Sequence, residues 1–140
     1  MSDEVLVRGI LLAHGSMAQG VADAVRRISG VGAEALVAVS NEGKSPDTLK
    51  AELNDLLSNG PVIVFTDLSS GSCALTARVC CRPGIDQVVV FGVNLPMLLD
   101  FVFHRHLPLQ ELVPRLLDRG KESLRSIPDF PHDADRTVSD

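Results

Sequence analysis

One histidine in this sequence lies where an open α/β sheet most often places its reactive groups. Residues 9–13 read Gly-Ile-Leu-Leu-Ala, an apolar run that stops at His14. Such a run, bounded by turn residues, is typical of a strand buried on both faces. His14 then falls at the carboxyl end of the strand, where ligands collect in sheets of this kind. Because a neutral imidazole has an unprotonated nitrogen, His14 is a candidate nucleophile.

Polar loops follow three further apolar runs, and in a parallel sheet these loops meet His14 at one edge. Asp67 follows the run 62–66 and is the candidate partner of His14. A carboxylate that accepts a hydrogen bond from Nδ1–H sets the tautomer of the ring and leaves Nε2 free to attack. Ser72 begins a predicted helix, whose unpaired N–H groups suit phosphoryl oxygens, and its hydroxyl adds another donor. The arrangement predicts phosphoryl transfer through a phosphohistidine, without a metal or an organic cofactor.

Five further residues in these loops are expected to shape the phosphoryl site or to border it. Two follow His14, two precede Ser72 and one precedes a predicted helix: Gly15, Ser16, Ser70, Gly71 and Asn94. Glycine adopts the left-handed backbone conformations that tight loops need. Serine hydroxyls can donate to phosphoryl oxygens. These positions complete the predicted site.

Alternating apolar and amphipathic segments predict the elements that position these residues. Four runs have the composition of buried parallel strands, namely 5–13, whose best part is 10–13, then 35–40, 62–66 and 88–92. Helical patterns lie between these runs and after the last one. The alternation predicts an α/β three-layer sandwich. Its central sheet is expected to be mainly parallel, with four strands in the order 2-1-3-4 and helices on both faces.

Residue types indicate where the helices begin and end. Ser45 and Pro46 suit the N-cap and first turn of the second helix, and Gly30 suits the C-cap of the first. In the last helix, Pro114 and Gly120 predict a kink or a late start. Proline removes a backbone hydrogen bond, and glycine destabilises a helix by about 1 kcal/mol relative to alanine.

The composition indicates one globular domain and excludes several classes of function. The chain has 140 residues, 45% of them hydrophobic and 22% charged, with a formal net charge of −5. An acidic chain without a Lys/Arg cluster is not expected to bind nucleic acid, and no apolar stretch is long enough for insertion into a bilayer. The N-terminus lacks a signal-peptide pattern, so a cytoplasmic protein is expected. Residues 1–127 are predicted to form the domain, and 128–140 a mobile acidic tail.

Three segments of the sequence occur in an order and spacing that match a known family. They are the strand ending in His14-Gly15, the segment Thr66-Asp67-Leu68-x-x-Gly71-Ser72, and the string Asn94-Leu95-Pro96-Met97-Leu98. Over about residues 8–127 the chain resembles the mannose-type enzyme IIA domains of the bacterial sugar phosphotransferase system. The resemblance implies an α/β sandwich, usually a homodimer.

The same resemblance implies a phosphoryl carrier and assigns roles to three residues. His14 would accept a phosphoryl group from the histidine-containing phosphocarrier protein and pass it to a IIB domain, which serves a membrane IIC/IID transporter. Asp67 aligns with the family's carboxylate that is hydrogen-bonded to the histidine, and Ser72 aligns with the family's phosphate-site serine. The role would lie in sugar uptake or its regulation, and the sugar would be selected by the membrane components.

The sequence departs from the family pattern in the loop before the third predicted helix. The family usually has Asp-Leu-x-Gly-Gly-Ser-Pro, whereas Ser70 replaces the first of these glycines here and Cys73 the proline. A positive φ at position 70 would cost serine roughly 1–2 kcal/mol. Many members also exchange a C-terminal strand between subunits, and the tail 128–140 has no strand pattern.

Two other interpretations remain open from the sequence. Small chelatase-like domains also place His-Gly after a first strand, but they need a second metal-binding histidine or acid in the cleft. His104 and His106 are poorly placed for that role, and cationic side chains near a helix C-terminus are the simpler interpretation. Cys73, Cys80 and Cys81 lack metal-site spacing and are expected to pack as small hydrophobic residues. The third interpretation is a non-catalytic regulatory module of the same fold.

Overall fold

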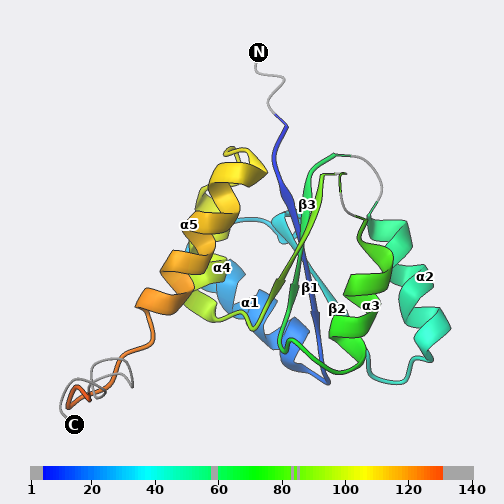
Figure 1. Cartoon of the computed structure of the whole chain (residues 1–140), viewed down its shortest axis with the longest axis horizontal. Helices are drawn as coiled ribbons and strands as arrows, with labels where there is room; N and C mark the ends of the chain where they lie inside the picture. The colour runs from blue at the N-terminus through cyan, green and yellow to red at the C-terminus, as the bar shows by residue number, and fades with distance from the viewer. Residues whose placement is uncertain (1–4, 58–59, 83, 85, 131–140) are drawn as a thin grey trace, which may run out of the picture.

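The structure, a computed structural model, describes residues 5–57, 60–82, 84 and 86–130. Within these residues, helices alternate with strands around a four-stranded parallel sheet (Figure 1). The strands are β1 (Arg8–Ala13), β2 (Leu36–Ser40), β3 (Val62–Thr66) and β4 (Gln87–Phe91). The helices are α1 (Met17–Ser29), α2 (Pro46–Leu56), α3 (Ser72–Cys80), α4 (Leu95–Phe103) and α5 (Leu109–Glu122), with a short 3₁₀ turn at Ala33–Ala35. The strand order β2-β1-β3-β4 confirms the predicted fold class.

Each face of the sheet packs against its own layer of helices. Along β1, Ile10 and Leu12 point to one face and Leu11 and Ala13 to the other, because successive side chains of a strand alternate. The first pair packs in a core with α2 and α3, and the second in a core with α1, α4 and α5, on opposite sides of the sheet in Figure 1. All four side chains are at most 1% exposed. Burial on both faces explains why the run contains no polar residue.

Strand β1 is shorter than predicted: it begins at Arg8 and not at residue 5. The backbone N–H of Val7 donates to the carbonyl oxygen of Arg105 at 2.9 Å. The Val7 carbonyl accepts from Nε of Arg105 at 2.7 Å. These bonds to the segment after α4 satisfy the backbone groups that would otherwise extend the ladder. Strand β3 has its predicted bounds, and β4 ends before Gly92, whose φ is 71°.

The predicted helix caps are confirmed. The hydroxyl of Ser45 accepts from the N–H of Thr48 at 3.1 Å, and Pro46 is the first residue of α2. Gly30 has the left-handed φ of 75° expected of a C-cap, and its N–H donates to the carbonyl of Arg26 at 2.8 Å. Both caps satisfy backbone groups that a helix end leaves unpaired.

The prediction of a late start for the last helix is wrong, because α5 begins at Leu109 and continues through Pro114. Gly120 has a packing role that its helix propensity hides. A Cβ at Gly120 would lie 2.8 Å from Cε of Met97 on α4. The carbonyl of Gly120 also accepts from Nδ2 of Asn94 at 2.9 Å. Glycine at this position therefore lets α4 and α5 approach closely.

After α5, residues 123–130 form neither helix nor strand in the described part of the chain. The rest of the predicted tail, 131–140, lies outside the described residues, so its mobility stays a prediction. Of the helices that the structure describes, none combines the length and the apolar character needed to cross a membrane.

Candidate active site

His14 and Asp67 meet at the carboxyl edge of the sheet. They follow β1 and β3, which are neighbours in parallel register. Oδ2 of Asp67 lies 2.8 Å from Nδ1 of His14 and accepts from the backbone N–H of His14 at 3.0 Å. Its Oδ1 accepts from the N–H of Leu68 at 3.0 Å. An ionised carboxylate only accepts hydrogen bonds, so Nδ1 carries the ring hydrogen and Nε2 carries the lone pair.

The Asp67 carboxylate is held in its ionised form. Burial by itself would raise its pKa, since the side chain is only 8% exposed. The hydrogen bonds from the backbone and ring of His14 outweigh burial and hold the pKa of Asp67 below its ordinary value. The charge is therefore present at neutral pH, where it can stabilise positive charge that develops on the imidazole.

The second nitrogen of the His14 ring faces the start of α3. A Cβ at Gly71 would lie 3.5 Å from Nε2 and 3.6 Å from Cε1. Gly71 is the N-cap of α3 and has a φ of 92°. The absence of a side chain thus permits this backbone conformation and leaves room beside Nε2. The His14 side chain is 37% exposed, so a phosphoryl donor can reach it.

Helix α3 directs backbone donors toward the same space. Its geometry leaves the first N–H groups, from Ser72 onward, without acceptors inside the helix. The N-terminal end of a helix also has a partial positive charge. The Ser72 side chain is exposed at this end. His14, Asp67 and Ser72 therefore lie at one edge of the sheet.

Asn41 joins the loops that follow three strands, although no specific sequence pattern selected it as a site residue. Its Oδ1 accepts from the backbone N–H of Gly15 at 3.1 Å, and its Nδ2 donates to the hydroxyl of Ser72 at 3.3 Å. The neighbouring Ser40 donates its hydroxyl to the carbonyl of Gly15 at 2.7 Å. The only sequence signal was that Asn41 follows β2 at the same edge. A side-chain amide that both donates and accepts is suited to linking two loops.

The other predicted loop residues have more varied positions. Ser16 is the exposed N-cap residue of α1, and its hydroxyl accepts no capping bond. Ser70 is exposed, and the positive φ of this loop belongs to Gly71. Asn94 caps α4, because its Oδ1 accepts from the N–H of Met97 at 3.2 Å while its Nδ2 bonds α5. Both ends of the Asn94 amide are therefore engaged in joining helices.

Cys73 brings a thiol to the buried side of the His14–Asp67 pair. It is fully buried in the core beneath α2 and α3, as predicted for a small hydrophobic residue. Burial and the nearby Asp67 carboxylate raise the pKa of its thiol to about 11, against a smaller lowering by the Ser72 hydrogen bond. Ligand atoms of His14, Asp67 and Cys73 all lie within 4.8 Å of one another. Among the described residues, these three form a group that could hold a metal ion.

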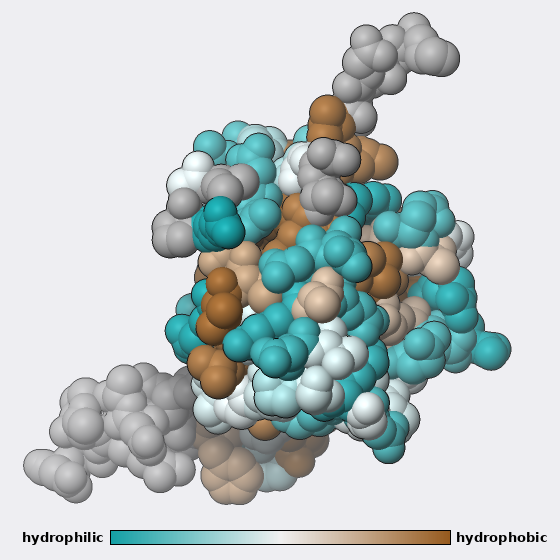
Figure 2. Space-filling model, turned by 90° about the vertical axis from the view of Figure 1, so that its right-hand side faces the viewer, coloured by the Kyte–Doolittle hydropathy of each residue, from teal (hydrophilic) through white to brown (hydrophobic). Residues whose placement is uncertain are grey.

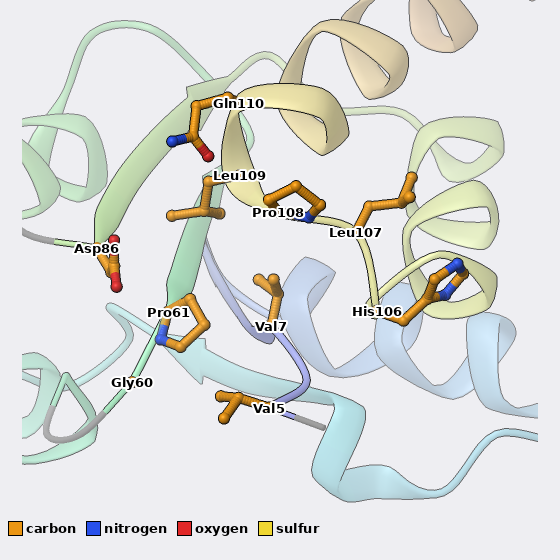
Figure 3. Close-up of a pocket in the computed structure, with 10 residues that line it drawn as sticks. All are labelled: Val5, Val7, Gly60, Pro61, Asp86, His106, Leu107, Pro108, Leu109 and Gln110. Atoms are coloured by element: carbon orange, nitrogen blue, oxygen red, sulfur yellow. The ribbon is translucent and has the colours of Figure 1, made fainter. Parts of the chain in front are cut away.

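Two cavities near opposite edges of the sheet differ in character. A cavity of about 660 Å³ lies at the amino edge, opposite His14, between the starts of β3 and β4 and the segment before α5 (Figure 3). Pro61, Asp86 and His106 are among its lining residues. A cavity of about 140 Å³ lies beside Asn41 and Ser72, between α2 and α3. That side of the molecule is mainly hydrophilic, with separate hydrophobic patches (Figure 2).

His104 and His106 do not supply the second histidine of a chelatase-like cleft. His106 lines the cavity at the amino edge, away from His14. His104 is the C-cap of α4, with Nδ1 2.8 Å from the carbonyl oxygen of Asp100, one turn earlier. This is the helix-terminal position expected from the sequence. Neither histidine joins His14 in one cleft.

Comparisons with known proteins show which family the chain resembles. The family model for the fructose IIA component of the phosphotransferase system (PTS) matches residues 9–115. The mannose/sorbose-specific IIA subunit from Enterococcus faecalis has a TM-score of 0.77 and 26% identity, over 91% of this chain and 98% of that one. A PTS component EIIA from Streptococcus agalactiae has a TM-score of 0.81 and 22% identity, over 88% of this chain and 98% of that one.

A third similar structure is described as a different kind of protein. A sigma-54 interaction domain protein from Enterococcus faecalis has a TM-score of 0.69 and 15% identity, over 89% of this chain and 100% of that one. A search of curated protein sequences finds no match. The family model covers most of the chain, including His14, Asp67 and Ser72. The chain therefore belongs to the fructose- and mannose-type IIA family of sugar PTS components, a family of phosphoryl carriers.

Proposed function

We propose that this chain accepts a phosphoryl group on Nε2 of His14 from the histidine-containing phosphocarrier protein and passes it to a IIB protein. Through that protein it would serve a membrane IIC/IID transporter from the cytoplasm, in sugar uptake or its regulation. One observation carries the proposal. Nδ1 of His14 is 2.8 Å from a buried Asp67 carboxylate, while Nε2 faces the open start of α3.

The proposed transfer uses only groups of the two proteins. The Nε2 lone pair attacks phosphorus, the new N–P bond forms, and the P–N bond of the donor phosphohistidine breaks with its electron pair returning to the donor nitrogen. The His14 ring keeps its Nδ1 proton and becomes cationic. The Asp67 carboxylate stabilises that cation through the 2.8 Å hydrogen bond. Transfer to the IIB protein reverses these changes at His14.

The phosphoryl oxygens would be held by donors at the start of α3. Ser72 offers a hydroxyl and a backbone N–H, and the helix end adds its partial positive charge. Nδ2 of Asn41 donates to Oγ of Ser72. The hydroxyl hydrogen of Ser72 therefore points away from Asn41. The loop after β2 would therefore help to position the phosphate donors.

Reconstitution of the donor chain tests the proposal. The full chain is incubated with labelled phosphoenolpyruvate, enzyme I and the phosphocarrier protein, and acid-labile label is measured. The wild type and His106→Ala should both be labelled, because His106 lies at the opposite edge. His14→Ala should take up no label. Chromatography after alkaline hydrolysis should identify the Nε2 isomer of phosphohistidine.

Two results would overturn the proposal. One is an unlabelled wild type when the phosphocarrier protein is itself fully phosphorylated. The other is full labelling of His14→Ala. Transfer from labelled wild type to a IIB protein then tests the second half of the relay, and retention of the label would limit the role to reporting phosphorylation state.

A further inference from the structure

We propose that His14, Asp67 and Cys73 form a binding site for a thiophilic divalent cation such as Zn²⁺, and that the bound ion prevents phosphorylation of His14. The site itself is independent of the proposed function, and only its inhibitory effect rests on it. The three side chains come from the ends of β1 and β3 and the first turn of α3. Their ligand atoms lie within 4.8 Å of one another.

The chemistry of the donor set favours zinc-like ions over magnesium. An imidazole nitrogen, a carboxylate oxygen and a thiolate sulfur are the three ligand types that Zn²⁺ takes in proteins, at about 2.0–2.3 Å. Mg²⁺ prefers six oxygen ligands and retains water. Three protein ligands leave one tetrahedral position for water, on the side where the His14 ring is exposed.

The burial of the ligands indicates a site that can hold an ion. Cys73 is fully buried, and the Asp67 side chain is 8% exposed. Asp67 is also held in place by bonds from the N–H groups of His14 and Leu68. A carboxylate and a thiolate together supply two negative charges to a divalent ion. The Cys73 thiol proton is released to solvent when the ion binds, because the thiolate is the ligand.

Ion binding and phosphorylation compete for the same ring. If the ion binds Nε2, the attacking nitrogen loses its lone pair to the metal. If the ion binds Nδ1 between the ring and Oδ2 of Asp67, the ring hydrogen moves to Nε2, which then has no lone pair. Both arrangements remove the nucleophile. By linkage, a phosphorylated His14 should in turn bind the ion less tightly.

Metal binding is tested first without any phosphotransfer. Cd²⁺ is titrated into the full chain, and the ultraviolet charge-transfer band of a cadmium–thiolate bond is recorded, while Zn²⁺ affinity is measured by competition with a chromophoric chelator. The wild type should bind one ion per chain and show the band. Cys73→Ser should lose the band and bind Zn²⁺ at least about tenfold more weakly.

Cys81→Ser is the matched control. Burial raises the pKa of the Cys81 thiol to about 11, as for Cys73, but Cys81 is not in the three-residue group. Its band and affinity should equal those of the wild type. Should Cys73→Ser fail to fold, His14→Ala provides the second variant, and it should weaken Zn²⁺ binding while the thiolate band remains detectable at high Cd²⁺.

The inhibitory effect is then tested by labelling from the phosphocarrier protein. Zn²⁺ should stop labelling of the wild type, and a chelator should restore it. Cys73→Ser is labelled by the same donor proteins, so an effect of Zn²⁺ on those donors would be equal for both. It should still be labelled at the Zn²⁺ concentration that stops labelling of the wild type. No band in the wild type, an unchanged band in Cys73→Ser, or equal inhibition of both proteins would overturn the proposal. A normal band in a protein that is never labelled would refute the phosphoryl-carrier function alone.

Discussion

At the residue scale, the proposed chemistry depends on one hydrogen bond, which gives the two imidazole nitrogens of His14 different roles. Asp67 holds Nδ1 of His14 at 2.8 Å, and its charge persists because two bonds from His14 outweigh the effect of burial on its pKa. The sequence indicated both residues, since each follows an apolar run. It did not indicate that a single oxygen, Oδ2, contacts both the ring and the backbone of His14.

Asp67→Asn should slow phosphorylation of His14 by on the order of 10²-fold or more, because an amide neither selects the tautomer nor stabilises the cationic ring. The measurement is a single-turnover rate of label transfer from the phosphorylated carrier protein. Asp23→Asn is the control, since the pKa of Asp23 is also lowered, by its hydrogen bond to Arg27, but on the exposed side of α1. Equal rates for wild type and Asp67→Asn would show that the carboxylate does not orient the ring.

The lowered pKa of Asp67 also predicts a pH dependence of stability. Its folded pKa lies below the unfolded value of about 3.9. The ionised carboxylate therefore contributes stability above the unfolded pKa, and that contribution is lost as pH falls through the folded pKa. Urea unfolding of wild type and Asp67→Asn should show a difference at pH 7 that shrinks below about pH 4. A difference that grows on acidification would contradict this sign.

Gly71→Ala should affect both stability and phosphorylation. Alanine at a φ of 92° costs roughly 1–2 kcal/mol, and its Cβ would lie 3.5 Å from Nε2 of His14. Gly30→Ala is the matched control, because its φ is 75° and nothing lies within 4 Å of the added Cβ. Thermal unfolding should place both variants below the wild type. Only Gly71→Ala should be labelled more slowly, and slow labelling of both would point to strain as the cause.

At the element scale, the strands were predicted closely and the loops that join them were not. Strand β3 has its predicted bounds because an unbroken apolar run between turn residues leaves little freedom in its assignment. The prediction that residues 5–7 belong to β1 is wrong, because Val7 pairs with Arg105, about one hundred positions away. Asn41 was not predicted as a site residue, because its contacts also come from residues far away in the sequence. Its importance comes from Gly15 and Ser72, which only the folded chain brings near it.

Gly9 shows how the residue type at one position of β1 depends on a distant side chain. A Cβ at Gly9 would lie 2.6 Å from Cε2 of Phe101 and 3.0 Å from Cδ1 of Leu36. The Phe101 ring is fully buried and packs edge-on against Phe65, with centroids 5.0 Å apart, so it has little room to move. Phe101 of α4 therefore leaves no room for a side chain at position 9, the first residue of the apolar run.

Gly9→Ala should destabilise the protein by about 1–3 kcal/mol through overpacking. Gly20→Ala on α1 provides the contrast, since nothing lies within 4 Å of its added Cβ and alanine favours a helix. The two variants should shift the urea midpoint in opposite directions. A stable Gly9→Ala would mean that α4 can move away from the sheet without loss.

At the scale of the whole molecule, His14 and the first turn of α5 lie at opposite edges of the sheet. His14, Asp67 and Ser72 lie at the carboxyl edge, whereas α5 packs on one face and begins at the amino edge, beside the cavity in Figure 3. The separation follows from the parallel topology, which places all carboxyl ends together. Substitutions in the core near the start of α5 should therefore change stability without changing phosphoryl transfer.

Leu112→Ala tests this separation. Leu112 is fully buried in the core beneath α5, so the substitution should cost about 2–5 kcal/mol. The labelling rate of the folded protein should remain that of the wild type at a temperature where both are folded. A large loss of labelling in the folded variant would show that packing around Leu112 affects the carboxyl edge.

The sequence by itself determined the α/β class, the strand order and the pairing of His14 with Asp67. Apolar runs and the residues that follow them are local signals, and parallel topology converts them into one shared edge. Only the tertiary structure decided the contacts among residues that no local pattern connects. It brought Asn41 to Gly15 and Ser72, and it placed the Cys73 thiol beside the imidazole and the carboxylate. Side-chain packing sets such contacts, and it depends on residues far apart in the chain.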